Sequence, residues 1–492
     1  NGLNIVAIAV LIIFYVFFSL LFNNLLLKMD CKKHQFVYFA AASANIMTMF
    51  SAIGYAWPSP SIPKLNGQVD PERNPLPRPT TILEDSWITS LMSLGALVGP
   101  LFSSILANKF GRKRTLIMFS VPMILSNVIL IFANRVVHFY IARFLVGMGT
   151  GCVFTVIPLY VAEISDIDNR GFTSMFLALT MTSTQLILYI ISPYITISNL
   201  AVVSLIPAVL FFLTFVFFVP ESPYYFVMIN RQEEAKKSLA MLRRVATSDI
   251  HLKKELYDIS RTVEETRSEK VGLRDLLQSD VVIRCLLISV GLMVFQQFTG
   301  ILAIVSYLQT IFEATNSSIP SEVSVMIVGL LQTIVNIITS RLVDRIGRKT
   351  LIMLSNTGIL VSLITLGAYF YLQINGYNVD SLSWLAIGSI MFYIFWFNFG
   401  IGPIPWTVAG ELFPSNLKTY LNGITAFSNI ICGFLISLLF PTLSQIMGMA
   451  WSIWFFAIWT AVSLVFVYYF LPETRGRSFI EIQMMLREGR TV

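Results

Sequence analysis

Long apolar runs alternate with short polar stretches along almost the whole chain. Most of these runs are longer than the roughly 20 residues that a helix needs to cross a bilayer. Val136–Ala162 is typical, since only His138 and Arg143 interrupt it. Two longer runs, Gly171–Pro220 and Tyr420–Pro472, hold no charge and have room for two helices each. This pattern predicts a bundle of membrane-spanning helices rather than a soluble core.

The runs predict twelve spans, six on each side of a polar stretch at about Ile229–Val282. The single runs are Gln35–Pro63, Ser86–Asn108, Thr115–Asn134, Val136–Ala162, Cys285–Phe312, Val323–Ser340, Thr350–Val379 and Ser381–Gly410. We expect the two double runs to part near Ser192-Pro193 and near Pro441-Thr442. In the central polar stretch, Leu252, Leu256, Ile259 and Val263 recur at helical spacing, which predicts short amphipathic helices.

One short polar sequence occurs twice, at equivalent places in the two halves. Asn108–Lys113 follows the second span and reads NKFGRK, and Asp344–Lys349 follows the eighth and reads DRIGRK. The glycine permits a tight turn between helices. A duplicated half in a membrane protein suggests a transporter whose substrate site lies between the two repeats.

Lysine and arginine gather in the loops that fall on one side of the predicted membrane. Four of the loops on the opposite side contain neither residue. The first outer loop, between the first and second spans, is the exception and holds three cations and four acidic residues. The positive-inside rule therefore places the central stretch and both termini in the cytoplasm. The sequon Asn316-Ser317-Ser318 lies in an opposite loop, so we expect Asn316 to face outside and to be open to glycosylation.

Composition narrows the function classes. The chain is 55% hydrophobic and only 12% charged, about half of the roughly 25% charge of a soluble domain. The net charge of +7 therefore belongs to loops that orient helices and does not predict nucleic-acid binding. The four cysteines and three histidines are scattered, which supports no disulfide framework, metal site or catalytic cluster. We expect neither an enzyme nor a cofactor.

The first 28 residues stand apart from this scheme. Residues 1–27 are uncharged and long enough to span a bilayer, whereas Met29 and the residues after it read like an ordinary cytoplasmic amino terminus. We expect residues 1–28 to be a non-native or upstream apolar segment, translated in error, rather than a working element, with an extra span or an uncleaved signal as alternatives. The predicted parts are then a six-helix half at 29–228, a cytoplasmic helical loop at 229–282, a second half at 283–472 and a cytoplasmic tail at 473–492.

Several short motifs follow particular spans. They are Tyr55–Pro60 with Ile62–Leu65 at the first span, Pro220–Pro223 after the sixth, Gln296–Gly300 in the seventh, Gly402–Trp406 in the tenth and Pro472–Gly476 after the twelfth. With these motifs the chain resembles the sugar porters of the major facilitator superfamily, and most of all the insect facilitated trehalose transporter group. The resemblance runs from about Met29 to the carboxyl end.

That resemblance implies an all-α membrane protein with the major facilitator fold. It implies a monomeric plasma-membrane carrier that moves trehalose or a hexose by alternating access. A proton-coupled sugar symporter and a non-transporting sugar-sensing receptor are the alternatives. Proton-coupled relatives typically carry an aspartate after the Gly-Tyr step of the first span, but Ala56 follows Gly54-Tyr55 here, and residues 35–63 contain no Asp or Glu. Transport without ion coupling is therefore expected.

A sugar hydroxyl donates and accepts hydrogen bonds, so an apolar-walled site needs amides together with an aromatic surface. Gln296 and Gln297 supply amides in mid-span, and Trp406 supplies a ring and an N–H donor. The breakers in Gly402–Pro405 let the tenth span bend where it lines a cavity. Helix-to-helix hydrogen bonding is the alternative role for the glutamines, and a core position is the alternative for Trp406.

Other candidate ligands come from the resemblance alone. They are Gln185, Gln332, Asn398 and Asn429. Four family positions depart from the expected polar or aromatic type and hold Leu302, Ala178, Ile430 and Gly433. A different sugar, weaker binding or loss of transport stays open on that account. The family's use of position 302 also implies that the seventh span is broken near Thr299-Gly300.

Charged groups near membrane depth are costly and usually paired. The resemblance implies that one set forms a cytoplasmic latch that is closed when the carrier faces outward. Its members are Glu163, Arg170, Glu411, Lys418, Arg112, Lys113, Arg348, Lys349, Glu221 and Glu473. Static anchoring of the loops is the alternative. Arg143 in the fourth span is expected to tie helices together.

Overall fold

The computed structural model describes residues 35–69, 74–166, 170–247, 249–268, 280–315, 319–342, 346–413 and 418–474, with 481 and 485. The predictions for residues 1–28 and Asn316 lie outside this set. Within it every regular element is helical. Twelve segments are long and apolar enough to cross a membrane. The predicted all-α, twelve-span architecture is confirmed.

The helices form two compact units. The first comprises the described residues within 1–57, 67–79 and 94–268, and the second those within 58–66, 80–93 and 269–492. The residues that lead into α4, and its first turns, thus pack in the second unit although they precede the central stretch in the chain.

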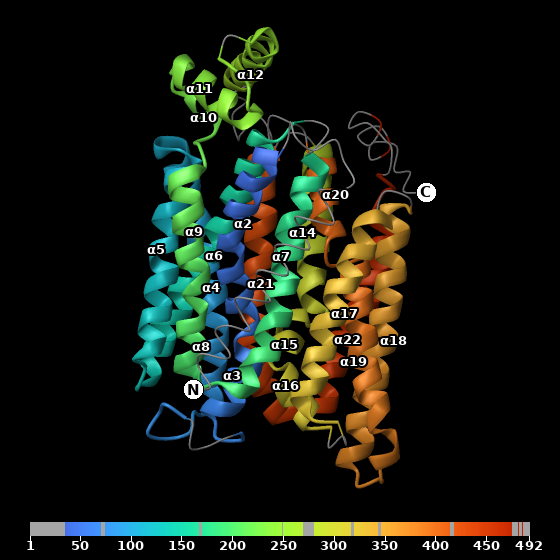
Figure 1. The fold of residues 1–492 in the computed structure, drawn as a ribbon. Coiled ribbons are helices and arrows are strands. Elements are labelled where there is room, and N and C mark those ends of the chain that lie inside the picture. The colour runs from blue at the N-terminus through green and yellow to red at the C-terminus, as the bar shows by residue number, and fades with distance from the viewer. Residues whose placement is uncertain are drawn as a thin grey trace. The chain divides into compact units, whose positions relative to one another are not determined.

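In the first unit, α2 packs against α6, α7 and α9, and α5 packs against α6 and α8 (Figure 1). The helices are α2 (Gln35–Ala56), α4 (Ile82–Phe110), α5 (Arg112–Ile131), α6 (Val136–Ile164), α7 (Arg170–Ile191), α8 (Ile197–Ser204) and α9 (Ile206–Phe211). A π-helical turn at Phe212–Val216 completes the sixth span. The fifth and sixth spans part at Ser192–Tyr194, as predicted.

In the second unit, α14 packs against α21, and α18 packs against α19 and α22. The helices are α3 (Pro58–Leu65), α14 (Asp280–Phe298), α15 (Ile301–Ser306), α16 (Leu308–Glu313), α17 (Ser321–Leu342), α18 (Arg348–Ile374), α19 (Ser383–Phe399), α20 (Ile404–Leu412), α21 (Lys418–Met447) and α22 (Met449–Phe470). These pairs are the counterparts of α2 with α7 and of α5 with α6 and α8, so the repeat in the sequence recurs in the packing.

Two spans of the second unit are broken where the sequence predicts it. The seventh stops at Phe298 and resumes at Ile301, and Gly300 between them has φ +88°. The tenth stops at Phe399 and resumes at Ile404. Glycine adopts this positive φ without strain.

The predicted boundary between the last two spans was wrong. Pro441 lies inside α21, which continues to Met447, and the chain turns instead at Gly448 with φ +82°. A proline removes one backbone donor and bends a helix, and a packed membrane helix tolerates that loss.

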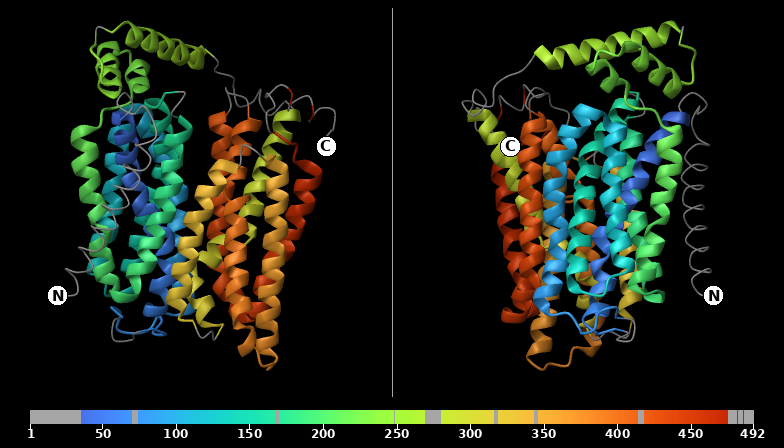
Figure 2. Two further views of the ribbon diagram at one scale, coloured as in Figure 1. Left: turned by 45° about the vertical axis from the view of Figure 1, so that its right-hand side comes forward. Right: turned by 90° about the vertical axis from the view of Figure 1, so that its left-hand side faces the viewer.

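Three central helices lie at one end of the first unit's spans (Figure 2). They are α10 (Pro223–Met228), α11 (Gln232–Arg243) and α12 (Ile250–Ser268). Leu252, Ile259 and Val263 of α12 pack with Leu239 of α11 and Val227 of α10 in one apolar cluster. The predicted amphipathic helices are therefore present, and their apolar faces cover one another.

Candidate functional site

Three buried amides join α14 to α21 in the second unit. Asn429 donates from Nδ2 to Gln296 Oε1 at 2.7 Å, and Gln297 donates from Nε2 to Asn429 Oδ1 at 2.9 Å. All three side chains are buried. Each amide both donates and accepts, which is the chemistry expected of a site for hydroxyl groups. The structure thus brings together three of the predicted ligand residues.

Gln296 also holds the break in the tenth span. Its Nε2 donates to the carbonyl oxygens of Ile401 and Gly402 at 2.7 and 2.6 Å. Buried backbone groups released by a broken helix need such partners. The helix-to-helix role weighed for Gln296 is therefore present in this conformation.

Ser355 of α18 supports the same break from another helix. Its Oγ donates to Trp396 O at 2.7 Å and accepts from Ile401 N at 3.0 Å. The side chain is fully buried. Sequence reasoning missed this residue because nothing distinguishes it from the other serines of the spans.

Other amides retain unused hydrogen-bonding capacity. The Oε1 atoms of Gln297 and Gln332 are buried and accept no hydrogen bond within the described part of the chain. In the first unit, the Gln185 side chain is buried, and no hydrogen bond to it is found among the described residues. A buried acceptor without a donor is costly, so a hydroxylated ligand would relieve that cost.

Two further candidates have different surroundings. Asn398 donates to Ile394 O at 2.8 Å and accepts from Asn336 at 3.5 Å, so its hydrogen bonds stay within α19 and toward α17. The Trp406 side chain on α20 is 47% exposed, which contradicts the core position weighed for it.

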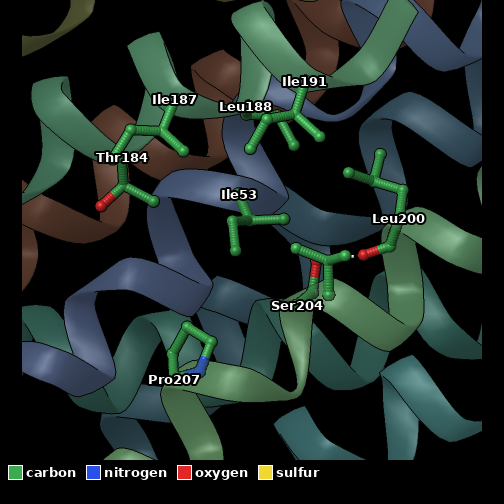
Figure 3. A pocket seen from close by; sticks show the side chains of 9 residues that line it. Ile53, Thr184, Ile187, Leu188, Ile191, Leu200, Ser204 and Pro207 are labelled. Carbon is green, nitrogen blue, oxygen red and sulfur yellow. Dashed lines mark hydrogen bonds between the residues drawn. The ribbon is translucent and has the colours of Figure 1, made fainter. Parts of the chain in front are cut away.

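A small cavity in the first unit is a poor candidate for the sugar site. It lies among α2, α7, α8 and α9, and its lining is apolar apart from Thr184 and Ser204 (Figure 3). It has room for about one water molecule. A sugar ring needs far more space and more polar partners.

The glycine of the first repeat lies against a carboxylate. Glu221 Oε1 accepts from the backbone N–H groups of Arg112 and Lys113 at 2.9 and 3.0 Å. A Cβ at Gly111 would collide with the Glu221 carboxylate. Arg112 in turn pairs with Glu163 at 2.8 Å; the Arg112 side chain is buried and that of Glu163 is largely so.

The second unit repeats this arrangement. Glu473 accepts from the backbone N–H groups of Arg348 and Lys349 at 2.8 and 3.1 Å, and a Cβ at Gly347 would collide with its carboxylate. Arg348 pairs with Glu411 at 3.2 Å. Each described pair lies within one unit.

The lysine that lies two residues after each of these glycines makes contacts of its own. Two other predicted latch residues have side chains outside the described set. Lys113 Nζ donates to Val216 O at 2.8 Å, and Lys349 Nζ lies 5.7 Å from the Tyr468 ring centre. Arg170 and Lys418 begin α7 and α21, and their side chains lie outside the described set.

Arg243 forms a buried junction that sequence reasoning also missed. From α11 it donates to Ile164 O at 3.0 Å and to Glu255 Oε1 at 2.6 Å, and it pairs with Asp166. It thereby joins α11 and α12 to the end of α6. The sequence offered one signal for it, which is that this arginine directly follows the apolar residue Leu242 in an amphipathic helix.

The chain is similar to known transporters over most of its length. The family model described as "Sugar (and other) transporter" matches residues 5–486. The chain is 31% identical over 452 residues to the facilitated trehalose transporter Tret1 of Bombyx mori, covering 92% of this chain and 86% of that protein. It is 30% identical over 445 residues to Tret1 of Culex quinquefasciatus, covering 90% and 84%.

Among solved structures, the chain is similar to a partially occluded inward-open conformation of the xylose transporter XylE from E. coli. The TM-score is 0.74 at 21% identity, covering 90% of this chain and all of the other. At that identity the likeness concerns the fold alone, and it confirms the predicted arrangement of two six-helix halves.

Proposed function

Since the chain belongs to the sugar transporter family of the major facilitator superfamily, we propose that it is a facilitative carrier of trehalose or a hexose. It would move the sugar across the plasma membrane by alternating access, as a monomer and without any covalent step. The main support is the cluster of buried amides beside two broken spans, in which Gln297 keeps an open acceptor, together with a second open acceptor at Gln332 on α17. Sugar hydroxyls are donors of the kind that these acceptors lack.

The sequence around the first span supports transport without ion coupling. No carboxylate occurs in residues 35–63. Arg143 donates to Gly54 O at 2.6 Å and lies 5.4 Å from the Trp57 ring centre, which fits the helix tie predicted for it. A carboxylate that titrates during the cycle is the usual means of coupling protons to a conformational switch, and the Gly54-Tyr55 step is followed by alanine instead.

The two repeated charge clusters are proposed to hold the cytoplasmic ends of the helices within each unit. Each joins the turn after one span to the end of another through Arg112–Glu163 or Arg348–Glu411. Both termini and the central helices would then face the cytoplasm, with Asn316 on the outer side. A latch between halves would require partners to be exchanged during the cycle.

A sugar-sensing receptor is the second candidate. Leu302, Ala178 and Gly433 remove hydroxyl partners that the family resemblance would place there. Such a protein would bind sugar and give no useful flux.

Uptake of labelled sugars into cells that lack their own hexose transporters tests the proposed function. We expect saturable uptake of trehalose or a hexose above that of cells with an empty vector. Uptake should also fall in a Gln297→Leu variant at equal surface expression. Saturable binding without uptake would favour the receptor, and neither binding nor uptake of any sugar would contradict both.

A further inference from the structure

Two residues that lack hydrogen-bonding side chains meet beside the amide cluster. Leu302 is the second residue of the short helix α15 (Ile301–Ser306), and Gly433 lies on α21. A Cβ placed on Gly433 would lie 2.5 Å from Leu302 Cδ1. Real Cβ atoms do not approach another heavy atom so closely, so Leu302 occupies the space that a side chain at 433 would need.

We propose that Leu302 and Gly433 form one specificity-determining pair. The missing side chain at 433 makes room for the leucine, and the leucine supplies an apolar wall beside the amides. The apolar residue at 302 and the missing side chain at 433 then have one steric cause, since the leucine fills the space that the glycine leaves. This inference rests on the proposed sugar transport and narrows the class of sugar that the site takes.

The open acceptor of Gln297 adjoins this apolar wall. The same Cβ position on Gly433 is 3.3 Å from Gln297 Oε1, which is buried and accepts no hydrogen bond within the described residues. A ligand there must bring a hydroxyl donor to Gln297 and an edge free of hydroxyls to Leu302. A hydroxyl facing the leucine would lose its water partners and gain none.

The site therefore suits a sugar in which one ring edge lacks a free hydroxyl. A deoxy sugar meets this requirement. So does a non-reducing disaccharide, in which both anomeric oxygens belong to the glycosidic bond. Free glucose keeps its anomeric hydroxyl and all its other hydroxyls, so it is expected to bind less well because it must bury one of them against Leu302.

A double-mutant cycle tests the steric pairing. The melting temperature of the purified protein is measured for Gly433→Ala, Leu302→Ala, the double variant and the control Gly423→Ala. Gly423 lies on the same helix with nothing within 4 Å of an added Cβ. Contacting residues give non-additive effects. We expect Gly433→Ala to lower the melting temperature and the double variant to regain part of the loss, whereas the control should hold or raise it because alanine favours a helix more than glycine does. Additive effects would overturn the pairing.

Competition by glucose and its monodeoxy analogues tests the specificity. The assay is uptake of whichever labelled sugar the native protein carries, in the native protein and in Leu302→Asn at matched surface expression. In the native protein, at least one monodeoxyglucose should compete as well as glucose or better. In Leu302→Asn, glucose should gain about tenfold over that analogue, the size of one recovered hydrogen bond.

The two assays separate the two claims. If every analogue keeps its rank in Leu302→Asn, the specificity role of the pair is overturned even though transport is intact. If the native protein neither binds nor carries any sugar, the proposed function fails, whatever the melting temperatures show about the contact.

Discussion

Mid-span amides in this protein differ in how their hydrogen bonds are used. Both polar atoms of the Gln296 amide bond to the protein: the oxygen accepts from Asn429, and the nitrogen donates to the carbonyl oxygens at the break in the tenth span. Gln297 and Gln332 each keep a buried oxygen that no described residue bonds. Under the proposed function, Gln296 supports the site, and we expect the open oxygens of Gln297 and Gln332 to accept hydrogen bonds from a substrate.

Gln332→Leu distinguishes a ligand residue from a structural one. The substitution removes a buried acceptor that the described part of the protein leaves unpaired, so thermal stability should hold or rise. Sugar affinity should fall by about tenfold if a hydroxyl donates to that oxygen. Competition binding and thermal unfolding are the two measurements.

Thr333→Val, one residue further along α17, is the matched control, since among the described residues the threonine hydroxyl bonds only to Gly329 O of its own helix. It should leave both quantities nearly unchanged. A drop in stability for Gln332→Leu with no change in affinity would assign Gln332 a structural role.

Sequence reasoning found the amides but not their supports. Gln296, Gln297 and Asn429 carry a signal because an amide in an apolar run is unusual and needs a partner. Ser355 carries no such signal, since a serine can bond to its own helix and needs no second helix. Its role depends on where the tenth span breaks relative to α18, which only the packing reveals.

Among the elements, the break in the tenth span is the most heavily supported. Four backbone groups between Trp396 and Gly402 are bonded by two side chains, Gln296 and Ser355. A break fixed in this way keeps a defined shape where α19 gives way to α20. The amide cluster and this break are consequently one structural unit.

Ser355→Ala should destabilise the protein because Ile401 N loses its acceptor in a fully buried place. An orphaned buried donor costs about 1–3 kcal/mol. Ser362→Ala on the same helix is the control, since within the part of the chain that the structure describes that hydroxyl bonds only to Gly358 O, four residues before it. Denaturant or thermal unfolding should show a clear loss for Ser355→Ala and a much smaller one for Ser362→Ala. Equal losses would mean that Ser355 does not support the break.

The apolar runs predicted where the helices lie, but they gave one helix end wrongly. The breaks at Gly300 and Gly402 were predicted because glycine and proline interrupt a run at a place with other polar residues. Pro441 gave a false boundary because a proline inside a packed membrane span bends the helix without ending it. The turn at Gly448 is a lone glycine between two apolar stretches, and local sequence alone does not distinguish it from the glycines inside helices.

At the scale of the whole molecule, the duplication is visible in both packing and charge. The contacts Gly111–Glu221 and Gly347–Glu473 are the same feature built twice, each with a neighbouring arginine paired to a span end. Within each unit the cluster joins helices that are distant in the chain. In the proposed carrier, each cluster would hold the helices of its own unit together during the transport cycle.

The central claim is sugar movement without ion coupling, and counterflow in liposomes tests it most directly. Purified protein is reconstituted into vesicles loaded with unlabelled trehalose or hexose, and entry of the same labelled sugar is followed with and without a protonophore. We predict transient counterflow that a protonophore leaves unchanged and no steady accumulation above the outside concentration. Accumulation driven by an imposed proton gradient would contradict uniport, and the absence of counterflow for every sugar tested would contradict transport itself.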